Sequence, residues 1–303
     1  MAQLDRRRFV AGLAASTLLL TSNTPLRTRK TLLRPIPSSG ENIPVIGMGS
    51  WRTFDIGDDQ SALETRADIL RLFFDCGGRV VDSSPMYGSS QTVIGNAVQK
   101  LDNADGLFSA DKVWTSGLTE GQRQIEESRS RWNLPKFDLL QVHNLVDWRV
   151  QLKTLFAMKE AGNLRYVGVT SYDGINYDLL EQIMKNEPID FVQFSYNIAD
   201  RRAEDRLLPL ASDRNIGVIV NRPFQEGRLL DSVRGRVLPD LANKIGSKNW
   251  AQYLLQYIVS HPAVTVTIPA TSRVDHMREN IAVLHKPVPH SRLREKMAND
   301  FAS

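Results

Sequence analysis

The alternation of short apolar runs with longer segments of helical spacing constrains the fold of this chain more than any other feature of its sequence. The runs lie near Val45–Gly49, Arg79–Asp82, Val113–Thr115, Phe137–Val142, Tyr166–Val169, Phe191–Phe194, Val218–Val220 and Val264–Ile268. Between them, apolar residues recur about one helical turn apart, as Leu180 and Met184 do before Pro188. Eight strand–helix units along one chain are typical of a (β/α)8 barrel, which we expect as a single domain.

A doubly wound parallel sheet is the alternative fold for such an alternation. That fold carries a glycine-rich dinucleotide fingerprint between its first strand and its first helix. Here only Gly47 and Gly49 match the fingerprint, and Arg52 stands where the third glycine belongs. The barrel is therefore the prediction.

Polar residues follow the predicted strands at the end where a barrel carries its active site. Asp82 closes the second strand, Tyr87 lies on the loop after it, and His143 follows the fourth strand. A carboxylate can hold a neighbouring cation or hydroxyl, and a phenol of shifted pKa can donate a proton. The sequence therefore predicts an acid–base site built around Asp82 and Tyr87.

Residues 1–30 are expected to be a leader, which leaves residues 31–303 for the barrel. Paired arginines within Asp5–Val10 precede the apolar run Phe9–Leu20, which is too short to cross a bilayer comfortably as a helix. The order of residues resembles a twin-arginine signal, used by proteins that fold before export. We therefore expect recognition by the twin-arginine export machinery, a periplasmic location and no stable membrane insertion. A basic, frayed terminus on a cytoplasmic protein is the alternative.

Charge and cysteine content exclude several classes of function. Residues 1–35 hold seven Lys or Arg residues and one acid, while the whole chain has a net charge of +4 and a pI near 9.2. The remainder is thus slightly acidic, and nucleic-acid binding, which needs a basic patch in the domain, is not expected. With Cys76 as the single cysteine, neither an intramolecular disulfide nor a cysteine-cluster metal site is possible, and we predict no metal.

Several motifs, in order, resemble the aldo-keto reductase family. They are I-P-V-I-G-M-G at residues 43–49, D-S-S-P-M-Y-G at 82–88, L-L-Q-V-H-N at 139–144, V-G-V-T-S-Y at 167–172, F-V-Q-F-S-Y-N at 191–197 and I-P-A-T-S-R at 268–273. The resemblance implies reduction of aldehydes and ketones with NADPH on a barrel. It also implies a catalytic set of Asp82, Tyr87 and His143, with Tyr87 as proton donor to the carbonyl oxygen.

The lysine of the family's catalytic set is expected to be missing. The family places it after a threonine at the end of the third strand, where this chain has Thr115 and then Ser116. Lys112 lies four residues upstream, roughly 13 Å away along an extended strand, toward the opposite end of the barrel. Without an ammonium beside it, a phenol keeps a pKa near 10, so altered or slower chemistry is expected.

The resemblance also implies a set of cofactor-binding residues. They are Ser171 and Gln193 for the nicotinamide carboxamide, Asn221 and Arg222 after the seventh strand, and Thr271, Ser272, Arg273, Glu279 and Asn280 at the far end of the cofactor. Family members often have an aromatic residue at the Asn221 position. Two hydroxyls and the Arg273 guanidinium suit a 2′-phosphate, so NADP(H) is favoured over NAD(H).

Two functions remain open from the sequence. The first is an exported NADP(H)-dependent oxidoreductase acting on a small carbonyl compound or the corresponding alcohol. The second is a non-catalytic barrel that binds or senses a nucleotide, which the changes at Ser116 and Asn221 favour. The joint presence of Asp82, Tyr87 and His143 favours the enzyme.

Overall fold

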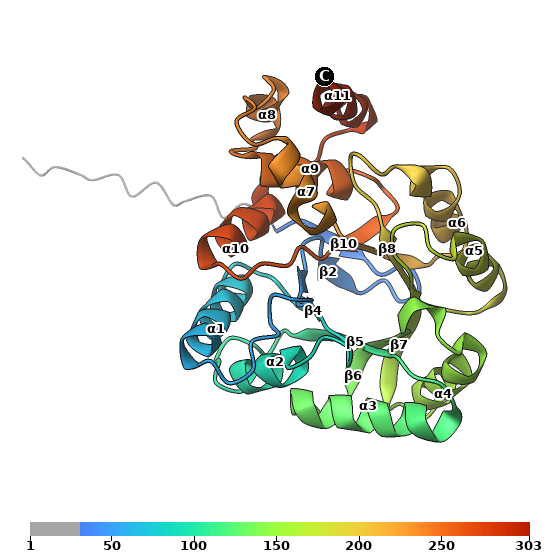
Figure 1. Cartoon of the computed structure of the whole chain (residues 1–303). Helices are drawn as coiled ribbons and strands as arrows, with labels where there is room; N and C mark the ends of the chain where they lie inside the picture. Colours follow the sequence, from blue (N-terminus) through green and yellow to red (C-terminus); the bar gives the residue numbers. More distant parts are fainter. Residues whose placement is uncertain (1–30) are drawn as a thin grey trace, which may run out of the picture. The chain divides into compact units, whose positions relative to one another are not determined.

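Eight parallel strands form the centre of the structure, a computed structural model that describes residues 31–303. The predicted twin-arginine segment lies outside the described residues. The strands are β3 (Met48–Gly49), β4 (Val80–Asp82), β5 (Phe108–Val113), β6 (Phe137–Val142), β7 (Leu164–Thr170), β8 (Phe191–Ser195), β9 (Gly217–Asn221) and β10 (Val264–Thr267). They are hydrogen-bonded in chain order, and helices surround them (Figure 1). The predicted (β/α)8 fold is confirmed.

Glycines close the barrel where its first and last strands meet. Gly49 forms a parallel bridge with Ala270, and the Gly47 amide donates to the Thr267 carbonyl at 2.8 Å. A Cβ atom on Gly49 would lie 2.9 Å from the Ile268 carbonyl oxygen, closer than side chains tolerate. The two glycines considered for a dinucleotide fingerprint thus serve close backbone approach at the closure.

The helices are amphipathic and pack their apolar sides on the outside of the barrel. They are α1 (Gln60–Asp75), α2 (Ser90–Val98), α3 (Leu118–Trp132), α4 (Trp148–Glu160), α5 (Tyr177–Asn186), α6 (Leu207–Asp213), α7 (Arg228–Ser232), α8 (Leu241–Ile245), α9 (Trp250–Val259), α10 (Val274–Ile281) and α11 (Ser291–Ala302). In α5, for example, Leu180, Ile183 and Met184 are buried at helical spacing. No helix within residues 31–303 is long and apolar enough to cross a membrane.

A short antiparallel hairpin and a layer of large side chains fill one end of the barrel. The hairpin consists of β1 (Leu33–Pro35) and β2 (Asn42–Pro44). Ile36 and Ile43 beside it are fully buried in one cluster with Phe108 and Phe191 from the barrel interior. Large apolar side chains therefore pack together at this end of the barrel.

The third strand of the barrel begins five residues earlier in the chain than predicted and ends two residues earlier. The run Val113–Thr115 was expected, but β5 covers Phe108–Val113 and pairs with β6 in register, with Lys112 opposite Gln141. The residues of this strand include Ser109, Asp111 and Lys112, which are buried although they are polar. Because polar groups occupy these positions, no apolar run marks the strand in the sequence.

Candidate active site

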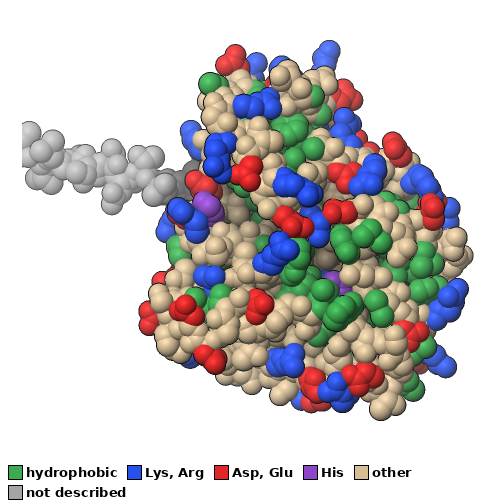
Figure 2. Space-filling model, in the orientation of Figure 1, with side chains coloured by type: hydrophobic (Ala, Val, Ile, Leu, Met, Phe, Trp, Pro, Cys, Tyr) green, Lys and Arg blue, Asp and Glu red, His purple; other side chains and the backbone are tan. Residues whose placement is uncertain are grey.

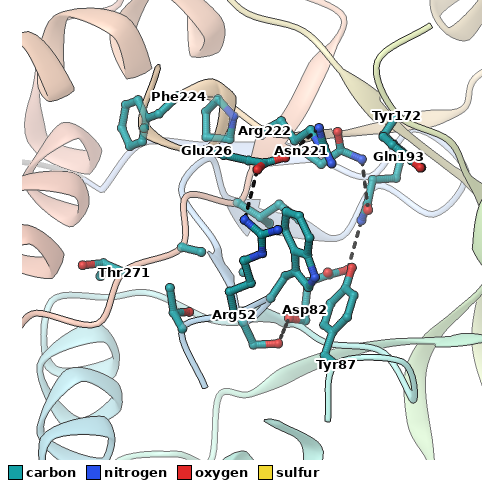
Figure 3. A pocket seen from close by; sticks show the side chains of 18 of the residues that line it. Arg52, Asp82, Tyr87, Tyr172, Gln193, Asn221, Arg222, Phe224, Glu226 and Thr271 are labelled. Carbon is teal, nitrogen blue, oxygen red and sulfur yellow. Dashed lines mark hydrogen bonds and ion pairs between the residues drawn. The ribbon is translucent and has the colours of Figure 1, made fainter. Parts of the chain in front are cut away.

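A pocket of about 490 Å³ lies at the carboxyl ends of the strands. Hydrophobic side chains gather around a hollow near the centre of the face in Figure 2, with basic and acidic side chains on one side of it. Asp82 and Tyr87 lie on one side of the pocket, opposite Asn221, Arg222 and Glu226 (Figure 3). Among residues 31–303, no group of His, Cys, Asp or Glu side chains is arranged to hold a metal ion.

A buried ion pair joins β4 and β5 at the base of this pocket. The Lys112 ammonium lies 2.6 Å from Asp82 Oδ2, and the exposed fractions of the two side chains are 0% and 3%. Lys112 Nζ also donates to the Ser83 carbonyl at 2.7 Å. The expectation that no lysine reaches Asp82 is therefore wrong.

The physical reason for this error is the position of β5. Because the strand ends at Val113, Lys112 is its penultimate residue, and its side chain reaches the Asp82 carboxylate at the end of the neighbouring strand β4. Ser116, the position predicted to have replaced the lysine, lies beyond the strand and is exposed. The distance of roughly 13 Å expected for Lys112 applies to a strand that extends as far as Ser116, whereas β5 ends at Val113.

Two glutamine side chains complete the surroundings of the Asp82 carboxylate. Gln193 Nε2 donates to Asp82 Oδ1 at 3.0 Å, and Gln141 Nε2 approaches the same oxygen at 3.4 Å. Asp82, on β4, therefore accepts hydrogen bonds from side chains on three other strands, β5, β6 and β8. This network fixes the carboxylate, and through it the ammonium of Lys112.

Tyr87 lies on the loop after β4, next to the buried ion pair. Lys112 Nζ is 5.2 Å from the centre of the Tyr87 ring. Burial raises the pKa of Tyr87 to about 12, while the nearby Lys112 ammonium lowers it and Asp82 raises it. In the absence of a ligand the phenol is therefore protonated at neutral pH, with a cation placed to stabilise its anion.

His143 follows β6 and contacts Tyr87 from the side. The two rings are 5.7 Å apart in an edge-to-face arrangement. His143 Nδ1 and Ser84 Oγ are 2.8 Å apart, and the ring is 6% exposed. Burial, followed by the Lys112 charge, lowers the pKa of His143 well below its usual value. The imidazole is therefore neutral at physiological pH.

A groove leads from the acid–base centre to the loop after β10. Thr271, Ser272 and Arg273 line the main pocket, while Glu279 and Asn280 line a second pocket of about 400 Å³. The two pockets share five lining residues: Phe224, Leu230, Ala270, Thr271 and His276. The two pockets therefore adjoin each other beside the loop after β10.

The comparisons with known proteins agree with this geometry. The family model described as "Aldo/keto reductase family" matches residues 45–295. Methylglyoxal reductase YeaE of Escherichia coli is 28% identical over 257 residues, which cover 82% of this chain and 88% of that protein. The chain belongs to the aldo/keto reductase family. It is thus an oxidoreductase by family.

Solved structures of this family share the fold of the chain. An aldo/keto reductase from Klebsiella pneumoniae, in complex with NADP and acetate, superposes with a TM-score of 0.74 at 24% identity, covering 90% of this chain and 95% of that one. A thermostable aldo-keto reductase in complex with the inhibitor epalrestat gives a TM-score of 0.75 at 26% identity, with coverages of 89% and 100%.

Most residues predicted for the site line one of the two pockets. Those in the main pocket are Asp82, Tyr87, His143, Gln193, Asn221, Arg222, Thr271, Ser272 and Arg273, and those in the second are Glu279 and Asn280. Ser171 lines neither, and its hydroxyl donates to the Ile175 carbonyl. Lys112 is missing from the predicted site. Its signal in the sequence is its position, one residue before the end of β5, where a side chain can reach the active end of the barrel.

The part of the main pocket around Asn221 departs from the common aldo/keto reductase pattern. The Asn221 amide donates to the Ser171 carbonyl at 3.0 Å and accepts from the Ser195 hydroxyl at 2.7 Å, so protein groups already occupy it. The next residue, Arg222, lies over the rings of Tyr172 and Trp51, 4.6 and 5.3 Å from their centres. A flat guanidinium, rather than an aromatic ring at position 221, therefore forms this part of the pocket.

An ion pair crosses the mouth of the main pocket. Arg52, on the loop after β3, lies 3.2 Å from Glu226, on the loop after β9 (Figure 3). Glu226 also pairs with Arg222 at 2.9 Å. Because Arg52 is 68% exposed, the outer pair is a weak connection between two loops rather than a fixed wall.

Proposed function

We propose that this protein is an NADP(H)-dependent oxidoreductase that reduces an aldehyde or ketone to an alcohol, or carries out the reverse oxidation. The observation that supports this most directly is the buried Lys112–Asp82 pair beside Tyr87. Together with His143, this arrangement places three groups at the base of one pocket. They are the protonated Tyr87 phenol, an ammonium that stabilises its phenolate form, and a neutral imidazole.

The proton transfer follows from the charges around Tyr87. The phenol donates its proton to the carbonyl oxygen as that oxygen becomes an alkoxide, and the resulting phenolate lies beside the Lys112 ammonium. Asp82 keeps Lys112 charged and in place. Neutral His143 is placed to hydrogen-bond the substrate oxygen, and in the oxidation the same proton moves back to Tyr87.

The groove fits an extended dinucleotide, and NADPH supplies the hydride when it is bound. The hydroxyls of Thr271 and Ser272 and the Arg273 guanidinium are suited to a 2′-phosphate, while Glu279 and Asn280 lie where an adenine would be held. The similar enzyme from Klebsiella pneumoniae was solved with NADP, which supports the same cofactor here. Gln193, bonded to Asp82, and Asn221 and Arg222 would border the nicotinamide.

The substrate side of the pocket is mostly apolar. Trp51, Met86 and Tyr172 line it beside the acid–base centre. A small carbonyl compound fits this setting, and methylglyoxal, the substrate named for the similar Escherichia coli reductase, is a reasonable first probe. Both an aldehyde panel and a ketone panel belong in the assay.

A non-catalytic nucleotide-binding barrel is the alternative function. Its support in the sequence was the change at Ser116 and the change at Asn221. Because Lys112 lies beside Tyr87, the serine at position 116 no longer supports this alternative. Only the change at Asn221 still supports it. The enzyme is therefore the better-supported function.

The test is NADPH consumption with methylglyoxal and simple aldehydes, measured for the wild type and for Tyr87→Phe. We expect the variant to bind NADPH with unchanged affinity and to reduce carbonyls roughly 10²–10⁴-fold more slowly, because it lacks the transferable proton. Failure of the wild type to bind NADPH, or equal turnover by the variant, would contradict the proposed function.

We also propose that the protein is exported through the twin-arginine route with its cofactor already bound. The paired arginines before the apolar run Phe9–Leu20 support this. Replacing Arg6 and Arg7 together with lysine should leave the protein in the cytoplasmic fraction of the producing bacterium. Equal distribution of the variant and the wild type between fractions would overturn this proposal and favour a cytoplasmic enzyme.

A further inference from the structure

A second buried carboxylate lies directly behind the acid–base centre. Asp111 precedes Lys112 on β5, so the two side chains point to opposite faces of the strand. Lys112 enters the barrel, whereas Asp111 lies between the barrel and helices α2 and α3. Asp111 is fully buried and has no place in the chemistry described above.

Three N–H groups surround the two oxygens of Asp111. The Lys112 amide donates to Oδ1 at 2.7 Å, while Gln91 Nε2 at 2.8 Å and Trp132 Nε1 at 2.5 Å donate to Oδ2. The donors come from β5, α2 and α3 respectively. Hydrogen bonds from N–H donors stabilise the charged form of a carboxylate and so oppose the effect of its burial.

The charged groups that face Asp111 are few. Within residues 31–303 no Lys, Arg or His side chain forms an ion pair with it. Lys112 on β5 and Asp82 on β4 act on it through the strand layer. On α3, Arg131 reaches it through Gln91 Oε1, at 3.2 Å, and also lies 4.0 Å from Glu127. From β6, apolar Leu140 stands opposite it in register.

Opposing effects bring the titration of this group into the physiological range. Burial raises the pKa of Asp111 to about 7, with a smaller contribution from the Asp82 charge, while the Lys112 charge and the hydrogen bonds from the Lys112 amide and Gln91 oppose this rise. Its negative charge in turn raises the pKa of Tyr87 and of Lys112. An ionised Asp111 therefore keeps Lys112 an ammonium and keeps the Tyr87 phenol protonated to higher pH.

We propose that Asp111 is a positioning residue for the acid–base pair, which fixes the Lys112 main chain and sets the pH range over which Tyr87 exchanges its proton. This inference rests on the proposed function, because it concerns the same proton transfer. The charge acts on Tyr87 through Lys112 and through the protein interior, without touching the substrate.

The test is the pH dependence of wild type and Asp111→Asn in both reaction directions. Removing the charge lowers the pKa of Tyr87, so the loss of carbonyl reduction at high pH and the rise of alcohol oxidation should both move to lower pH, by about one unit. At a fixed pH above the wild-type midpoint, reduction should then be about tenfold slower. Below the pKa of Asp111 the two proteins should match, since wild-type Asp111 is then neutral too.

A second readout does not depend on activity. The titration of Tyr87 is measured by tyrosinate absorbance, as the difference between each protein and the same protein carrying Tyr87→Phe. We expect the Tyr87 transition in Asp111→Asn at lower pH than in the wild type. If the wild type shows no reductase activity, the proposed function fails while this titration still tests Asp111. Identical Tyr87 transitions would overturn the role of Asp111.

Two control variants separate charge from structure. Asp138→Asn removes a carboxylate from the next strand, β6, where it accepts from the Ser109 amide at 2.7 Å and pairs with Arg165. Trp132→Phe removes a donor to Asp111 but keeps its charge. Neither should move the alkaline transition of Tyr87. Should Asp111→Asn fail to fold, Asp111→Ser removes the same charge in a smaller polar side chain and is measured in the same way.

Discussion

The acid–base centre and the far end of the cofactor groove place their charges in opposite ways. Lys112 and Asp82 are almost completely buried and 2.6 Å apart, bound to each other and to neighbouring strands. Arg273, at the other end, is 61% exposed and pairs with Asp275, two residues further on in the first turn of α10. The charges at the centre are therefore fixed by the fold, whereas those at the groove end can exchange one partner for another.

This difference has a chemical meaning. A cation that stabilises a transient phenolate must be in position before the reaction, since rearranging it would add to the barrier. In the phosphate-binding role proposed for it, the Arg273 guanidinium only has to be available, and a bound phosphate would replace Asp275 as its partner. We therefore expect changes at the centre to affect both folding and turnover, and changes at the groove end to affect cofactor affinity alone.

The largest expected effect is that of Lys112→Met. The variant leaves the buried Asp82 carboxylate without its cation, which costs about 3–5 kcal/mol of unfolding free energy. It also removes the charge beside Tyr87, so turnover should fall roughly 10²–10⁴-fold. Chemical denaturation and steady-state kinetics measure the two losses. The double variant Asp82→Asn/Lys112→Met should recover part of the stability and none of the activity.

Ser116→Lys is the matched control for Lys112. Because Ser116 is exposed beyond the end of β5, a lysine there should leave stability and turnover unchanged in the wild type and should not rescue Lys112→Met. A large gain of activity from Ser116→Lys would mean that the site is built around the loop rather than around β5, and that the centre is not fixed by the fold.

Lys112 and Ser116 show which parts of the site can be predicted from the sequence and which cannot. The order of the eight strands follows from apolar runs, because parallel strands covered on both faces must be apolar. β5 does not follow this rule, because its residues Asp111 and Lys112 have polar partners inside the protein. The apolar residues alone therefore indicate a strand at Val113–Thr115. With the strand in that position, Lys112 is excluded from the predicted site.

The pocket lining after β10 could be identified more directly from the sequence. Thr271, Ser272 and Arg273 lie on the short segment between β10 and α10, and this position is visible without knowledge of contacts to distant segments. In contrast, the bond between Gln193 and Asp82 joins residues 111 positions apart, and the enclosure of Asp111 by Gln91 and Trp132 joins three separate elements. Such contacts depend on the packed barrel, so a reading of single motifs could not find them.

A smaller effect is expected from Arg273→Gln. The exposed Arg273–Asp275 pair contributes little to folding, so the denaturation midpoint should not change measurably. Without the guanidinium, the dissociation constant of NADPH should rise about tenfold, and that of NADH, which lacks the 2′-phosphate, should stay the same. Arg278→Gln is the control. Arg278 is exposed on α10, the helix that begins directly after Arg273, and it lines neither pocket.

The salt dependence of NADPH binding provides a second test of the role of Arg273. An exposed guanidinium–phosphate contact is screened by ions, so added salt should weaken NADPH binding to the wild type and to Arg278→Gln more than to Arg273→Gln. Turnover at saturating NADPH should be alike in all three proteins, because the Lys112–Asp82 pair is buried and screened much less. If Arg273→Gln lowered turnover at saturation, the two ends of the groove would be coupled, and the separation between a fixed centre and an exchangeable end would not hold.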